Sequence, residues 1–133
     1  MIEAKMPSGA ILKITPAPFE DAKALCEAFF EELKAMKLDP YVDVDVNFYK
    51  DIVMAAMSSK RFEKALQKCM ERAIYGDDQL LAKELPKIFE PIDNRQDYYF
   101  ACYEVAQVNI TPFMKGLYAE WSRVLAMLQK SPA

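Results

Sequence analysis

Apolar residues recur at helical spacing along most of this chain, and that periodicity restricts the fold more than any other feature. Between residues 19 and 37 they form one stripe of Ala22, Leu25, Cys26, Phe29, Leu33 and Met36. Similar stripes run through 46–57 and 60–74, and 98–108 is apolar nearly all round, as expected of a central helix. The pattern predicts a mainly α-helical protein.

Only the N-terminal segment departs from this periodicity. Residues 2–6 and 10–14 read as two short strands, because Leu12 and Ile14 alternate with Ile11 and Lys13. The dipeptide at residues 8–9 between them is Ser-Gly, a turn signal. We therefore expect a β-hairpin within residues 1–15.

Helix boundaries follow from capping residues, proline and glycine. Pro18 suits the start of the first long helix, Ser59 caps the helix over 60–74, and Gly76 ends that helix. A short helix follows through 80–85. The segment Asn-Ile-Thr-Pro at 109–112 predicts a break before a last helix that reaches about residue 129.

The length of 133 residues fits one domain. The expected architecture is a single domain over residues 1–130, in which the hairpin is followed by a compact bundle of five to six helices. Residues 131–133 are expected to be a tail.

The amino-acid composition offers few of the residues that enzymes use for catalysis. The chain has no histidine and three glycines, so it lacks the usual general base and any glycine-rich phosphate loop. Cys26, Cys69 and Cys102 are widely spaced among apolar neighbours, as buried reduced thiols are. Asp43 and Asp45 form an Asp-x-Asp pattern, which we interpret as a solvated loop and a helix cap. We predict a protein that is not an enzyme, with no catalytic residue, cofactor or metal.

Net charge and hydropathy limit the classes of partner that we expect this protein to bind. The net charge is −3 and the sequence pI about 5.1, which argues against nucleic-acid binding by bulk charge. The basic cluster at 60–72 is interpreted as the solvated face of a helix. No stretch approaches the ~20 apolar residues of a membrane span, and no signal peptide begins the sequence. We expect a cytoplasmic protein without a membrane partner.

A few apolar residues fall outside the predicted core stripes. Met54 lies off its stripe beside Tyr49, and Phe30 lies at the edge of its own. Flexible methionine suits adaptable binding surfaces, and the chain has eight. We therefore predict partner binding by Phe30, Tyr49, Met54 and Met57.

Two segments resemble the tail assembly chaperones of long-tailed phages (siphoviruses) and prophages. Residues 8–22 read SGAILKITPAPFEDA, similar to the hairpin and Pro-Ala-Pro-Phe helix start of that family. Residues 103–113 read YEVAQVNITPF, similar to the family's segment in which a helix ends at Asn and restarts at Thr/Ser-Pro-Phe. The segment 39–90 is compatible with the family without being diagnostic of it.

The resemblance implies an assembly factor without enzymatic activity that binds the tape measure protein and keeps it soluble. It further implies binding of the major tail protein as an additional partner, a frameshift-extended form of the chain itself, a place in the host cytoplasm, and absence from the mature virion. A homo-oligomer is left open. Two alternatives also remain, a helical head–tail connector subunit and a DNA-binding regulator that uses the basic face of the helix over 60–74.

Overall fold

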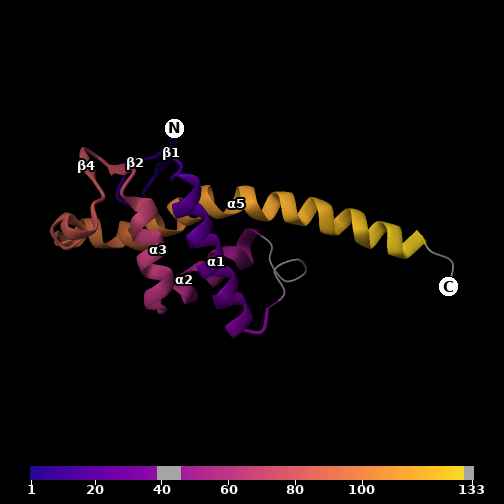
Figure 1. Ribbon diagram of the computed structural model, residues 1–133. Coiled ribbons are helices and arrows are strands. Elements are labelled where there is room, and N and C mark those ends of the chain that lie inside the picture. The colour runs from indigo at the N-terminus through magenta and orange to yellow at the C-terminus, as the bar shows by residue number, and fades with distance from the viewer. Residues whose placement is uncertain (39–45, 131–133) are drawn as a thin grey trace.

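The computed structural model describes the backbone of residues 1–38 and 46–130 and the side chains of residues 1–38 and 50–116 (Figure 1). The strands are β1 (Ile2–Lys5), β2 (Ile11–Ile14), β3 (Ala73–Tyr75) and β4 (Asp78–Gln79). The helices are α1 (Phe19–Ala35), α2 (Val46–Ala56), α3 (Lys60–Met70), the short 3₁₀ helix η1 (Ala82–Glu84), α4 (Leu85–Ile88) and α5 (Ile92–Lys130). The prediction of a mainly α protein is confirmed, and the predicted tail at 131–133 lies outside the described residues.

The sheet has four antiparallel strands in the order β1-β2-β3-β4. The predicted hairpin is its first pair, and Gly9 takes a φ of +96° in the turn. The expectation of a hairpin alone was wrong, because residues 73–79 form two further strands. Ala73 and Tyr75 are buried, and Gly76, at a φ of +62°, donates its N–H to the Ile11 carbonyl at 3.0 Å. Pairing with this segment thus satisfies backbone groups at the edge of β2 that a longer α3 would leave unpaired.

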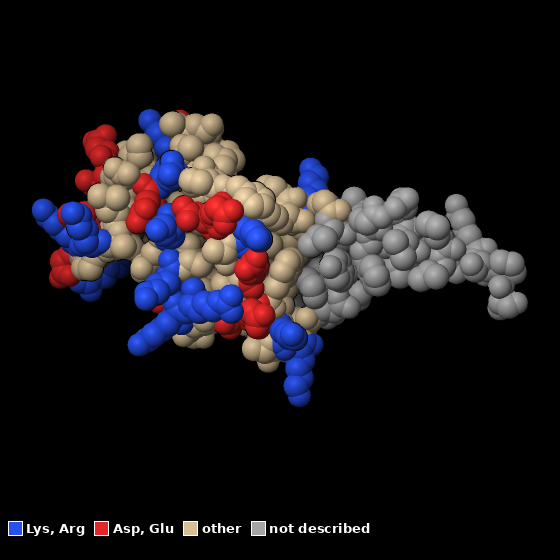
Figure 2. All heavy atoms as spheres, viewed as in Figure 1, with Lys and Arg blue, Asp and Glu red and all other residues tan. Residues whose placement is uncertain are grey.

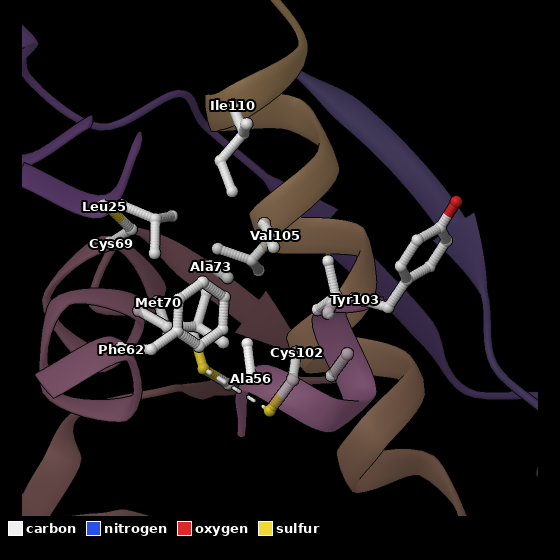
Figure 3. Packing of buried hydrophobic residues seen from close by; sticks show 14 of the residues in the cluster. Leu25, Ala56, Phe62, Cys69, Met70, Ala73, Cys102, Tyr103, Val105 and Ile110 are labelled. Carbon is white, nitrogen blue, oxygen red and sulfur yellow. Dashed lines mark hydrogen bonds between the residues drawn. The ribbon is translucent and has the colours of Figure 1, made fainter. Parts of the chain in front are cut away.

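Helices α1, α2, α3 and α5 enclose one core with the sheet. α1 and α3 pack against each other, and both pack against α5, which runs the length of the molecule in Figure 1. Leu25 of α1, Phe62 and Met70 of α3, and Val105 of α5 have 0% exposed surface and meet in this core (Figure 3). Ser59 caps α3 as predicted, since its Oγ accepts the Phe62 N–H at 3.4 Å.

The predicted break before a last helix was wrong, because α5 continues through residues 109–112. Asn109 is buried, its Nδ2 donates to the Val105 carbonyl, and its Oδ1 accepts the Ala17 N–H, each at 2.9 Å. The residue that seemed to end a helix therefore ties the entry of α1 to α5. Pro112 lies inside the helix on its exposed side, where solvent can satisfy the carbonyl that loses its donor. Burial of Ile110, two residues before Pro112, helps to offset this cost.

A buried carboxylate fastens the sheet to α5. Asp97 has 0% exposed surface and accepts hydrogen bonds from Ser8 N–H at 3.0 Å, from Ser8 Oγ, and from the Tyr75 hydroxyl at 2.5 Å. The Tyr75 hydroxyl also lies 3.3 Å from Asn94 Oδ1, and burial together with Asp97 raises the pKa of Tyr75 to about 12. The network links the hairpin turn, β3 and α5 in one polar contact.

Candidate functional site

Two methionines at the C-terminal end of α2 are partly exposed side by side, Met54 within the helix and Met57 one residue beyond it. Met54 and Met57 are three residues apart and half-buried, whereas Ile52, Val53 and Ala56 on the same helix are buried. With Ser58 and Tyr99 of α5 the two methionines line a pocket of about 410 Å³. Residues at the margin of a helix's inner stripe can line such a pocket while still packing against the core.

A second pocket adjoins the first at Tyr99. It has a volume of about 420 Å³, and its apolar lining comes from η1, α4 and the start of α5, with Gln67 and Arg95 at its polar side. We call the two pockets together the Tyr99 groove, and define it by the residues Met54, Met57, Leu85, Pro86, Phe89, Tyr98 and Tyr99.

Contacts between aromatic rings hold the floor of the Tyr99 groove. The ring centroids of Tyr75 and Phe89 are 5.1 Å apart, those of Phe89 and Tyr98 are 5.2 Å apart, and those of Tyr98 and Tyr99 are 5.2 Å apart. These distances are typical of favourable ring contacts. Because Tyr75 is fixed by Asp97, the series runs from a buried polar anchor to the 55%-exposed Tyr99. The groove is therefore largely preformed.

Cationic groups stand near both ends of the Tyr99 groove. Lys50, one turn before Met54, places its Nζ 4.6 Å from the centroid of the Phe100 ring. Lys50 also opposes the effect of burial on Glu104, whose pKa is nevertheless raised by desolvation. At the other end Arg95 forms an exposed ion pair with Glu90 at 3.3 Å. The surface is thus apolar along its length and charged at its margins.

The structure brings together two of the four predicted partner-binding residues. Met54 and Met57 line one pocket. Phe30 lies on α1, half-buried, with its ring centroid 6.4 Å from that of Phe29, and it is not among the residues that line the groove. The side chain of Tyr49 lies outside the described residues.

Sequence reasoning missed the aromatic residues of the groove. The segment 98–108 was expected to be a central helix, yet Tyr99 is 55% and Phe100 40% exposed. Successive residues on a helix point about 100° apart, so three aromatics in a row at 98–100 cannot all face one core. That run was the signal that would have revealed an exposed aromatic surface.

The chemistry-bearing groups lie elsewhere. Cys26, Cys69 and Cys102 are buried, and burial raises their pKa values to about 11, 12 and 12, so the thiols stay neutral near pH 7. Asp43 and Asp45 lie outside the described residues. In the part of the chain that the structure describes, no three Cys, Asp or Glu side chains are placed to share a metal ion.

The basic residues of α3 and of the turn after it are exposed, as the interpretation of a solvated face predicted. They are Lys60, Arg61, Lys64 and Lys68 in α3, and Arg72 in the turn. Figure 2 shows basic and acidic side chains interspersed over the face that carries α1 and α3. Within the described residues, no helix has both the length and the apolar character to cross a membrane.

Comparisons of this chain with models of known protein families, with curated proteins and with solved structures found no match. The Tyr99 groove and the segments quoted above therefore carry the functional argument.

Proposed function

We propose that this chain is a tail assembly chaperone, which binds an apolar helical segment of a tape measure protein in the Tyr99 groove and keeps that protein soluble during tail assembly. The observation that carries the proposal is the groove itself. Its methionine and aromatic side chains line two largely preformed pockets that share Tyr99. The family resemblance at residues 8–22 and 103–113 supplies the identity of the client.

The groove suits recognition of an amphipathic helix. Such helices insert apolar anchors at i, i+3 or i+4 and i+7 into a hydrophobic surface. Met54 and Met57 adapt their shape to different anchors, while Tyr98 and Tyr99 present large, rigid faces. A chaperone that meets many similar helices along one long client gains from this mixture of adaptable and rigid contacts.

Assembly rather than catalysis is further supported by the titratable groups. The three thiols are buried and protonated near neutral pH, so they do not act as nucleophiles in the folded protein. The proposal includes a place in the host cytoplasm, absence from the mature virion, recruitment of the major tail protein and a frameshift-extended form of the chain.

Co-expression with the tape measure protein from the same phage or prophage tests the proposal. The wild-type chain is expected to keep the client in the soluble fraction and to be captured with it. The Met54→Ser/Tyr99→Ser variant should lose at least about tenfold in affinity, because hot-spot truncations cost about 1–2 kcal/mol or more. Phe19→Ser is the matched control, since Phe19 is 63% exposed and lies outside the groove.

Three outcomes would contradict the proposal in different ways. An unchanged client solubility and no complex would remove the chaperone function. Equal losses in the groove variant and in the Phe19→Ser control would remove the groove as the site. Mass spectrometry of purified particles that finds the chain in stoichiometric amount would favour a head–tail connector subunit.

A further inference from the structure

Strand β1 forms an outer edge of the sheet. It pairs with β2 on one side, and within the described residues no strand pairs with its other side. The opposite edge of the sheet is β4, which has two residues and begins with Asp78. An exposed edge of this kind presents backbone N–H and C=O groups that another strand can bind.

Hydrogen bonding fixes which residues of β1 face outward. Met6 donates its N–H to the Ala10 carbonyl at 2.8 Å, so these two residues are a hydrogen-bonded pair. Hydrogen-bonded pairs alternate along an antiparallel ladder, so Ala4 and Ile2 also turn their backbone groups toward β2. Glu3 and Lys5 therefore direct their N–H and C=O groups to the outer edge.

We infer that β1 pairs antiparallel with β1 of a second copy of this chain, with Ala4 opposite Ala4 across a two-fold axis. In this register Glu3 of each copy exchanges both backbone hydrogen bonds with Lys5 of the other. Opposite charges then face each other twice across the interface. This inference does not depend on the chaperone function proposed above.

The neighbouring registers are unfavourable. A shift by one residue sets outward backbone groups opposite inward ones and forms no ladder. A shift that centres the axis on Glu3 places two carboxylates opposite each other, and one centred on Lys5 places two ammonium groups opposite each other. Like charges directly opposite each other are destabilising in a sheet. The charges and the alternation of hydrogen-bonded pairs therefore both favour the register with Ala4 opposite Ala4.

The apolar face of β1 agrees with this arrangement. Ile2 and Ala4 share the face of Leu12 and Ile14, which are buried, yet Ile2 is 45% exposed because the sheet ends beside it. In the dimer Ile2 lies opposite Met6 of the second copy, and the interface covers it. The two-fold arrangement is closed, so pairing of β1 ends with two chains.

Charge reversal tests this register. Sedimentation at increasing protein concentration is expected to show a reversible wild-type dimer, since four-residue strands bury little surface. Glu3→Lys and Lys5→Glu should each weaken self-association at least about tenfold, because both cross-strand pairs become repulsive. An equimolar mixture of the two variants should again dimerise, because every Lys of one faces a Glu of the other.

The mixture separates the interface from an effect on folding, because mixing does not repair a folding defect within either chain. Lys5→Glu lies opposite Ile11 of β2 and should retain the wild-type thermal midpoint, whereas Glu3→Lys lies opposite Lys13 and should lower that midpoint slightly. A monomeric wild-type chain up to its solubility limit would overturn the inference. So would wild-type affinity in both single variants, or a mixture that stays monomeric.

A cross-link gives a second, independent readout. Ala4 lies opposite itself at a non-hydrogen-bonded position, where Cα atoms are about 4.5 Å apart and a disulfide can form. Ala4→Cys should give a covalent dimer under mild oxidation, whereas Ile11→Cys on β2 should not, and the native thiols are buried. Equal cross-linking in both variants would overturn the register.

Discussion

Two apolar regions of this molecule are built from similar residues but differ in their access to water. In the core, Phe29 and Phe62 have 0% exposed surface and their ring centroids lie 6.3 Å apart. In the Tyr99 groove, the rings of Tyr98 and Tyr99 lie 5.2 Å apart, yet Tyr99 is 55% exposed. Ring contacts thus occur in both regions, and the two regions differ in how far their rings are buried.

The difference follows from position on each helix. Phe62 belongs to the inner stripe of α3, which packs against α1 and α5, whereas Met54 and Tyr99 flank the inner stripes of α2 and α5 and Met57 follows the end of α2. Residues at these margins pack against the core on one side and expose the other side to solvent. A preformed binding surface can therefore be the exposed border of a closed core.

Truncation of a core ring should give the largest effect. Phe62→Ala is expected to lower the free energy of unfolding by about 3–5 kcal/mol, because it removes a fully buried ring and leaves a cavity. Phe100→Ala, the matched truncation of a 40%-exposed ring beside Lys50, should cost about 1 kcal/mol. Urea denaturation measures both, and equal losses would refute the contrast between core and surface.

Removal of Asp97, the polar anchor beneath the groove, should have the second-largest effect on stability. Asp97→Ala is expected to cost about 2–3 kcal/mol, because the buried Tyr75 hydroxyl loses its carboxylate partner. The same variant should also weaken client binding, since Tyr75 supports Phe89 and through it the groove. Asp77→Ala, at an exposed turn, is the control, and urea denaturation with client capture gives both readouts. A loss of stability with unchanged binding would show that the groove does not depend on this anchor.

Sequence periodicity predicted the helices well where one face is buried. The stripes of α1 and α3 and the alternation in β2 each correspond to a buried face in the structure, and the Ser59 cap is present. In these segments local pattern and tertiary packing favour the same conformation.

The wrong predictions concern segments whose structure depends on contacts with residues far apart in the sequence. β3 forms because β2 offers it a free edge, and Asn109 stays helical because its side chain reaches Ala17 on another element. The methionine half of the groove could be predicted from the sequence, because Met54 lies off the apolar stripe of its helix. The other half required knowing that α4 and α5 come together at Phe89 and Tyr98. No local pattern carries that information.

The buried thiols of the core should make the free energy of unfolding depend on pH. Burial raises the pKa of Cys102 from the 9.0 of an exposed thiol to about 12. Above pH 9 the unfolded chain loses this proton while the folded chain keeps it, so the free energy of unfolding should fall by up to about 1.4 kcal/mol per pH unit per thiol. Cys102→Ala should show a shallower fall between pH 9 and 11 in urea denaturation. Parallel pH profiles of the two proteins would contradict burial of the thiolate-forming group.

The smallest effect on stability is expected at Tyr99, the proposed central anchor of the groove. Tyr99→Ser should lower the free energy of unfolding by about 0.5–1 kcal/mol, because the exposed ring loses only its contacts with Tyr98 and the methionines. Tyr99→Phe keeps the ring and should retain both stability and client affinity. Urea denaturation and client capture on the same preparations separate the two roles. If Tyr99→Ser cost as much stability as Phe62→Ala, Tyr99 would belong to the core, and the groove would lose its central anchor.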